Sequence, residues 1–204
     1  MSNLDKKLNI FYYMQTLNKP MNKHILFALD NLLDDYISHH SKTFVMRLDV
    51  HLPKEMQQDK ILHFNHRFIE KEKNAGYDPK YAMAREVSRK GNTHYHMALF
   101  LNGNKTKSIY RHVKNAEKVL RNVVGEEKQG EAWIERCDKT FKNGIMIRRN
   151  DPDRKARMEV ERQISYLAKT EQKEGVKGKT FFYSRKDKNQ DKSNDRHGRC
   201  QHSH

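Results

Sequence analysis

Cysteine, tryptophan, proline and long apolar runs are all scarce in this sequence. Its 204 residues include two cysteines, Cys137 and Cys200, with no Cys-x-x-Cys pair, so neither a disulfide framework nor a structural zinc site is indicated. No window has the apolar length of a transmembrane helix, which argues against a membrane protein. The glycine-rich pattern G-x-x-x-x-G-K is missing as well, and its absence excludes a built-in ATPase of the P-loop kind.

Positive charge, by contrast, is abundant. The 41 lysines and arginines outnumber the 26 acidic residues and give a formal net charge of +15. Such a field suits a polyanion, and nucleic acid is the usual one. An anionic membrane surface ranks lower, because the basic residues are spread along the chain instead of forming one juxtamembrane block. The N-terminal residues contain no apolar signal core, so we expect a cytoplasmic protein.

Apolar periodicity divides the chain into three parts. Residues 1–41 are expected to form an N-terminal helical extension, since apolar residues recur at helical spacing over 8–13 and 23–38. Residues 42–185 are expected to form the main domain, which is long enough to bury a core of its own. Residues 186–204 are rich in charged and polar side chains, so we expect a disordered basic tail there.

Strand and helix patterns alternate within the main domain. Period-two spacing over 41–52 predicts a strand with one apolar face and a second face that carries Arg47, Asp49 and His51. The segment 131–141 fits no single pattern, and we expect its Trp133 and Ile134 to pack in the core. Further strands are predicted at 81–88, 94–102, 144–149 and 180–184, and helices at 55–74, 110–124 and 153–170.

Two histidines open the apolar strand 94–102. In an extended chain His94 and His96 share one face, and two neutral imidazoles at this spacing can bind one divalent cation. The preceding strand and this one predict a β-hairpin, and a turn near residues 90–91 would place Glu86 opposite His94 or His96. Two simpler interpretations stay open: chance alternation in a chain with 12 histidines, and a surface glutamate.

The predicted helix 153–170 carries the second informative pair. Val160, Ile164 and Leu167 make its apolar stripe, so Tyr166 and Lys169 share the opposite face. A lysine beside a tyrosine can stabilise a phenolate and bind a phosphate, as a tyrosine nucleophile would require. By itself, the pattern fits an ordinary amphipathic helix better.

Three segments in this order, 44–50, 94–96 and 166–169, resemble the three motifs of the HUH endonucleases. The chain is most similar to the inovirus-type rolling-circle replication initiators of phages and prophage-like elements, for which 84–86 and 164–170 also look typical. The resemblance covers about residues 42–185. It implies an α+β fold of the ferredoxin-like plan, in which flanking helices pack on a central antiparallel sheet that carries the histidines.

The resemblance also implies a mechanism. His94 and His96 would bind Mg2+ or Mn2+ with Glu86 as the third ligand. Tyr166 would be the nucleophile that forms a 5'-phosphotyrosine link and releases a 3'-OH to prime rolling-circle synthesis, and Lys169 would neutralise developing charge. The expected substrate is single-stranded or hairpin origin DNA, and a host helicase and polymerase are the expected partners.

Other residues would assist this chemistry. Arg47 and Asp49 are expected to bind DNA or to support the histidines, and Arg162 to bind DNA. No second tyrosine neighbours Tyr166 on its helix, which predicts a single-tyrosine enzyme. Two alternatives remain: a non-catalytic basic regulator that binds DNA or RNA, and a tyrosine-dependent single-strand transposase.

Overall fold

The computed structural model describes residues 20–53, 56, 58–88, 93–137, 142–152, 154–170 and 178–185. The helix expected at 8–13, the hairpin turn near 90–91 and the tail expected at 186–204 lie outside the described residues.

Helices and strands are interspersed along the described chain. The α-helices are α2 (Lys23–His39), α3 (Gln58–Asn74), α4 (Tyr110–Val124) and α5 (Lys155–Ser165), and the 3-10 helices are η2 (Glu126–Glu131) and η3 (Tyr166–Ala168). The strands are β1 (Lys42–His51), β2 (Lys80–Val87), β3 (Thr93–Asn102), β4 (Trp133–Arg136), β5 (Ile145–Arg148) and β6 (Phe181–Tyr183).

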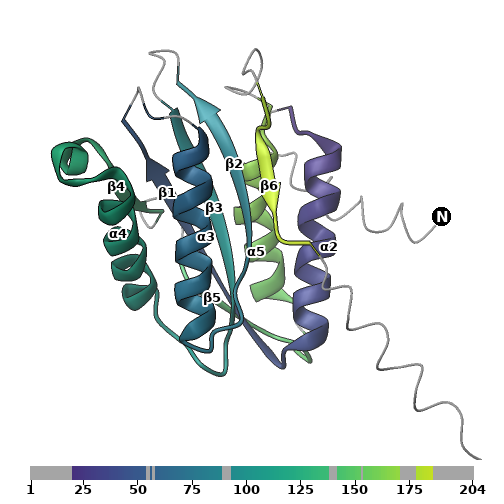
Figure 1. Ribbon diagram of the computed structural model, residues 1–204. Coiled ribbons are helices and arrows are strands. Elements are labelled where there is room, and N and C mark those ends of the chain that lie inside the picture. Colours follow the sequence, from purple (N-terminus) through teal and green to yellow (C-terminus); the bar gives the residue numbers. More distant parts are fainter. Residues whose placement is uncertain are drawn as a thin grey trace, which may run out of the picture.

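One antiparallel sheet organises these elements. Its strand order is β4-β1-β3-β2-β6, and β5 pairs with the other end of β1. The succession β1-α3-β2-β3-α4-β4 with β3 in the middle is the ferredoxin-like plan. Helices α3 and α4 lie on one face of the sheet, and α2 and α5 on the other (Figure 1). The predicted α+β class with a central antiparallel sheet and flanking helices is confirmed.

The alternation of side chains along the strands explains the two layers. Phe44, Met46, Leu48 and Val50 of β1 all point to the α3 and α4 side, where they share a core with Met97 and Leu99 of β3. The opposite face is apolar only over part of its length, where the small residues Ala82, Ala84 and Ala98 lie under α2 and α5. Toward the start of β3 that face becomes polar, and the candidate site lies there.

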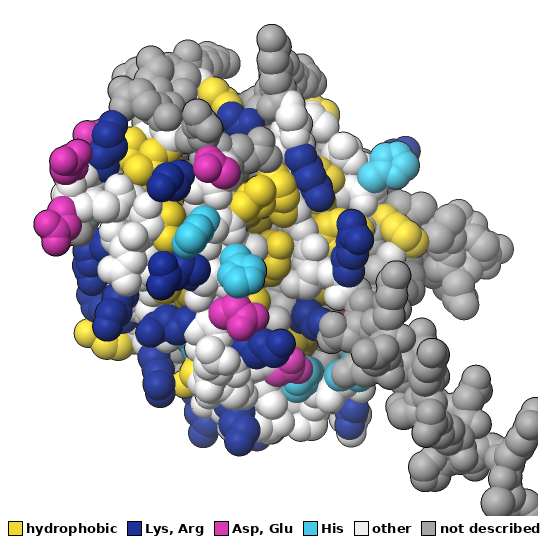
Figure 2. Space-filling view, in the orientation of Figure 1, with side chains coloured by type: hydrophobic (Ala, Val, Ile, Leu, Met, Phe, Trp, Pro, Cys, Tyr) yellow, Lys and Arg dark blue, Asp and Glu magenta, His cyan; other side chains and the backbone are white. Residues whose placement is uncertain are grey.

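The outer surface of α3 and α4 carries much of the positive charge (Figure 2). Because these helices cover the apolar side of the sheet, their charged side chains lie on the opposite side of the sheet from His94 and His96. Positive charge therefore extends over the molecule beyond the candidate site. The exposed basic residues on these two helices include Lys60, Arg67, Lys73, Arg111, Lys114, Lys118 and Arg121.

Two predictions from periodicity are wrong. Of the helix expected over 153–170, the α-helix ends at Ser165 and the 3-10 turn η3 continues to Ala168, after which residues 20–22 pair with 168–170. The Asn22 amide donates to Ala168 O at 2.7 Å, and the Thr170 amide to Pro20 O at 3.0 Å. Such pairing requires extended backbone and ends the helix. Trp133, expected in the core, lies exposed on the short edge strand β4.

The strand pairing along one edge of β1 is interrupted at Arg47, and one side chain supplies the missing hydrogen bonds. Residues 48–51 of β1 pair with β4 and residues 42–45 with β5, so Arg47 falls between the two partners. The Asn143 amide accepts a hydrogen bond from Arg47 N at 2.9 Å and donates one to Arg47 O at 2.9 Å. Asn143 thereby replaces the missing strand partner and holds the backbone of Arg47 in line.

Gly144, which follows Asn143, offers a test of packing beneath this break. It has φ of +81°, and a Cβ there would lie 2.7 Å from Ile109 Cγ2 and 2.9 Å from Phe44 Cζ. Gly125 has the same φ of +81° with nothing within 4 Å of a Cβ, so it is a matched control. Gly125 also has ψ of +164°, a backbone conformation open almost only to glycine, so we expect Gly125→Ala to lower the free energy of unfolding by about 1–3 kcal/mol. We expect Gly144→Ala to lower it by a further 1–3 kcal/mol, roughly, because of the close contacts.

Urea denaturation of both glycine variants measures this difference. Equal losses of unfolding free energy would show that the contacts of Gly144 with Phe44 and Ile109 do not limit the size of this residue. A larger loss for Gly144→Ala would confirm that close packing against β1 requires glycine.

Candidate active site

Four neighbouring strands present one row of side chains on the partly open face of the sheet. Trp133 of β4 pairs with His51 of β1, His51 with His94 of β3, and His94 with Glu86 of β2. Residues directly opposite one another in antiparallel strands project to the same face. The row therefore brings together side chains from four strands, and the predicted pairing of Glu86 with His94 is confirmed.

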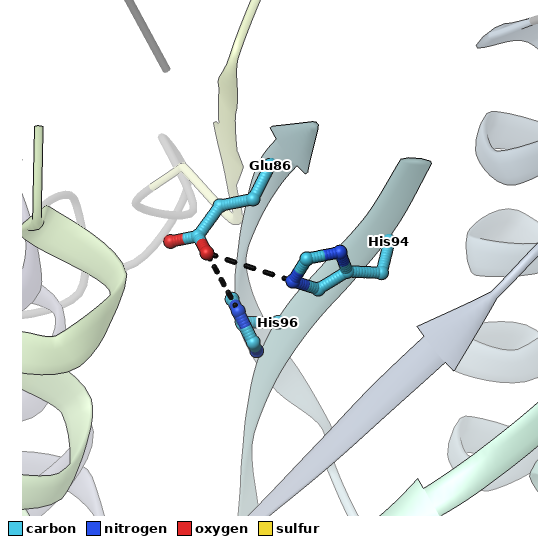
Figure 3. Close-up of side chains that lie close together, drawn as sticks. All are labelled: Glu86, His94 and His96. Carbon is cyan, nitrogen blue, oxygen red and sulfur yellow. Dashed lines mark hydrogen bonds and ion pairs between the residues drawn. The ribbon is translucent and has the colours of Figure 1, made fainter. Parts of the chain in front are cut away.

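Glu86, His94 and His96 converge on one point (Figure 3). Oε2 of Glu86 lies 3.0 Å from Nε2 of His96 and 3.5 Å from Nε2 of His94. One ligand atom from each residue lies within 4.8 Å of the other two. Glu86 is 3% and His96 4% exposed, whereas His94 is half-buried, so the cluster opens to solvent on the His94 side.

Asp49 contacts the His96 ring on the nitrogen that does not face Glu86. Its Oδ1 lies 2.7 Å from Nδ1 of His96, so the ring donates its Nδ1 proton to the carboxylate and turns Nε2 toward Glu86. Arg47 Nη2 approaches the same nitrogen at 3.4 Å, a longer contact that does not displace Asp49. Arg47 is buried and lies 3.5 Å from Asp49 Oδ1. Of the two roles predicted for Arg47 and Asp49, this geometry favours support of the histidines.

The charges of this group depend on one another. Burial acts to lower the pKa of His96, but hydrogen bonds to Asp49 and Glu86 outweigh it, and the pKa is raised. Burial acts to raise the pKa of Asp49, yet the hydrogen bond to His96 and the charges of His96 and Arg47 lower it overall. The cluster therefore favours ionised Asp49 beside positive charge on His96. A divalent cation at Nε2 would take the place of that positive charge.

The donor set fits a first-row divalent ion. Two imidazole nitrogens and one carboxylate oxygen suit Mn2+ better than Mg2+, because Mg2+ prefers oxygen ligands. Three protein ligands would also leave coordination positions for a phosphate oxygen or for water. His94, His96 and Glu86 are thus the residues that could hold the metal, with Asp49 as the group that orients one of them.

Tyr166 packs directly against this cluster. Its ring meets the ring of His96 edge-to-face, with centroids 5.0 Å apart and an interplanar angle of 84°. Lys169 Nζ lies 3.0 Å from the centroid of the Tyr166 ring, and Arg47 Cζ lies 4.7 Å from it. The backbone of Lys169 is held by its bridge to Met21. The tyrosine therefore lies among two cations and a candidate metal ligand.

Arg162 is the predicted site residue that does not join this group. Its exposed guanidinium forms two hydrogen bonds with Glu159, at 2.8 and 2.6 Å. The next residue, Gln163, is buried, and its backbone oxygen accepts a hydrogen bond from Arg47 Nη1 at 3.4 Å. The role of Arg162 in DNA binding remains a prediction, and it would act on the outer surface of α5.

Sequence reasoning assigned no role in the site to three neighbours of the cluster, which are Cys137, His51 and Trp133. The Cys137 thiol hydrogen-bonds Asp49, and burial raises the pKa of the thiol, which favours its protonated, hydrogen-bond-donating form. His51 stacks on Trp133 with centroids 4.3 Å apart. The period-two pattern of β1 had already placed His51 on this face, but no pattern connected it with Trp133 or Cys137.

A comparison with known protein families identifies the family of this chain. The profile of the YagK/YfjJ C-terminal domain family matches residues 5–184. The chain belongs to this family. The match spans every residue of the candidate site in this YagK/YfjJ domain, from Arg47 to Lys169. No match was found among curated proteins or among solved structures. Among the described helices of the domain, none is long and apolar enough to cross a membrane.

The carboxylate behind His96 can be tested by metal binding. We expect Asp49→Asn to weaken Mn2+ binding by about 10- to 100-fold, the usual effect of losing a partner that orients a ligand. Glu135→Gln is the matched control, because Glu135 pairs with Asp49 across the strands but its carboxylate contacts His51 and not His96. Isothermal titration of Mn2+ into each folded variant measures the affinities. Equal affinities for Asp49→Asn and wild type would contradict the orienting role.

Proposed function

We propose that this domain is an HUH-type endonuclease that nicks and rejoins single-stranded DNA through Tyr166. The observation that carries the proposal is the packing of Tyr166 against His96, within a cluster whose His94, His96 and Glu86 fit a divalent ion. A tyrosine beside such a cluster suits phosphoryl transfer, because the same centre can place a phosphate and supply an attacking oxygen.

The proposed reaction is a transesterification. The Tyr166 phenolic oxygen attacks the scissile phosphorus, a Tyr–O–P bond forms, and the bond from phosphorus to O3' breaks. The phenolic proton is released and the departing 3' oxygen takes up a proton, so the products are a 5'-phosphotyrosine and a 3'-OH. The ester linkage is conserved, and the reverse attack by a 3'-OH rejoins the strand. When bound, Mg2+ or Mn2+ would polarise the phosphate and offset its charge.

Residues of this chain would prepare each step. Arg47 and Lys169 flank the Tyr166 ring and supply positive charge where negative charge develops on phenolate and phosphate. Asp49 holds His96 so that its Nε2 stays directed at the metal position. These groups are buried or half-buried, so their geometry is set before DNA arrives. With Tyr166 alone on its segment, the enzyme would form one covalent link at a time.

This chemistry suits the start of rolling-circle replication in a phage or other mobile element. The free 3'-OH would prime a host polymerase, a helicase would displace the strand, and both would meet the protein in the bacterial cytoplasm. The origin would be single-stranded or a hairpin, so that its phosphate can reach the half-open cluster. The net charge of +15 supports binding to such a polyanion.

Covalent capture tests the nucleophile. We expect wild-type protein, incubated with Mn2+ and a labelled pool of randomised single-stranded and hairpin oligonucleotides, to form an adduct that survives a denaturing gel. Tyr166→Phe should reduce this adduct to the level seen in EDTA, because the phenyl ring keeps the packing but has no oxygen. Tyr183→Phe, on the edge strand β6, is the matched control and should react like wild type.

The outcomes separate the alternatives. An undiminished adduct in Tyr166→Phe would show that another residue is the nucleophile. Salt-dependent DNA binding without any adduct in Mn2+ would favour a non-catalytic regulator. Strand exchange by a dimer would favour a single-strand transposase, which shares the chemistry.

A further inference from the structure

Trp133 lies exposed beside the candidate site. It is 52% exposed on the edge strand β4. Tryptophan side chains usually stabilise a protein by being buried, so this exposure is unusual. The other exposed large apolar residues of the described chain lie on α2, α3, α4, α5 and β6, so Trp133 is the one such residue described on β4. An isolated exposed tryptophan next to a polar cluster suits a ligand with a flat ring.

One face of the Trp133 ring is already occupied. The His51 ring stacks on it with centroids 4.3 Å apart and an interplanar angle of 6°, and His51 in turn stacks on His94 at 5.6 Å and 15°. His51 Nε2 lies 3.4 Å from Glu135 Oε2, which helps to fix the imidazole. The indole is therefore backed on the inner side, and its exposed area belongs to the outer face and edge.

The three rings form a series that leads from solvent to the cluster. Trp133, His51 and His94 stand opposite one another on β4, β1 and β3. Two strand spacings of roughly 4.8 Å separate β4 from β3, which puts Trp133 about 10 Å from His94. A strand whose phosphate lies at the cluster would bring a neighbouring nucleotide to Trp133.

We propose that the outer face of Trp133 is a stacking platform for an unpaired nucleobase that flanks the scissile phosphate. The proposal rests on the proposed function for the position of that phosphate. Each nucleobase has a flat π-face, so an indole held by His51 would bind a base without demanding a particular sequence. A paired base is already stacked on both sides, and the platform therefore selects single-stranded DNA or a hairpin loop.

The sequence provides a direct probe, because Trp133 is the only tryptophan in the chain. We expect a single-stranded oligonucleotide, titrated in EDTA and low salt, to quench the emission of the full-length protein. An abasic strand of equal length keeps the phosphates but has no rings to stack. It should bind more weakly and leave the emission nearly unchanged.

Variants test whether stacking contributes affinity. From the usual contribution of one stacked base, Trp133→Ala should weaken binding of a fluorescently labelled strand by roughly 5- to 150-fold in an anisotropy titration. Trp133→Phe should recover most of the loss, because phenylalanine keeps a flat ring. Tyr110→Ala removes an aromatic side chain that is 64% exposed on α4, and it should bind like wild type. Circular dichroism confirms that each variant is folded.

These results separate the platform from the nuclease. Equal binding of base-carrying and abasic strands, with no change in emission, would overturn the platform even if Tyr166 forms its adduct. Equal affinities for Trp133→Ala and Tyr110→Ala would overturn it as well. Quenching without any adduct would keep the platform and count against strand transfer.

Discussion

The register of β3 against β1 and β2 is the constraint on which the candidate site depends. It places Asp49 beside His96, and Glu86 beside His94. Because side chains alternate, a slip of one residue would turn Glu86 toward α3 and α4 and break the cluster. The same slip would move Met83 out of the core beneath those helices. The apolar face thus fixes the register, and the polar face depends on that register for its geometry.

This polar face contains more buried charge than stability would favour. Arg47, Asp49, Glu86 and Lys169 are buried or half-buried within one group. Ionic groups taken from water are compensated only when they pair closely, and even then they add little to the free energy of unfolding. Here the positive and negative members alternate around His96 and Tyr166. Chemistry at the cluster explains this arrangement better than stability does.

Much of the fold and part of the site could be predicted from periodicity. Alternation along β1 and β3 assigned each residue to the correct face, and the hairpin brought Glu86 to His94 because its strands have nearly equal length on either side of a short connection. Tyr166 and Lys169 were found as a pair three residues apart. Each of these signals lies within one element or between two consecutive elements, where sequence spacing and spatial spacing correspond.

What could not be predicted depends on contacts between distant segments. The end of α5 is set by residues 20–22, which no local pattern connects with 168–170. The strand β4 is only four residues long, so its alternation could not assign a face, and the apolar character of Trp133 suggested burial. Spacing alone left two roles open for Arg47, DNA binding or support of the histidines, because its position between Asp49 and Tyr166 depends on the distant segment that carries Tyr166.

The end of α5 also determines which side chains surround Tyr166. In a continuous helix, Lys169 would lie about one turn beyond Tyr166, with its side chain directed along the helix surface. The 3-10 turn and the bridge to Met21 instead bring the ammonium over the aromatic ring. Beneath this turn, Ala84 and Ala98 leave room for the segment to approach the sheet. Helices thus close the face on the Tyr166 side, whereas exposure along the row rises from buried Glu86 through half-buried His94 and His51 to exposed Trp133. A bound strand would therefore approach from the β4 edge.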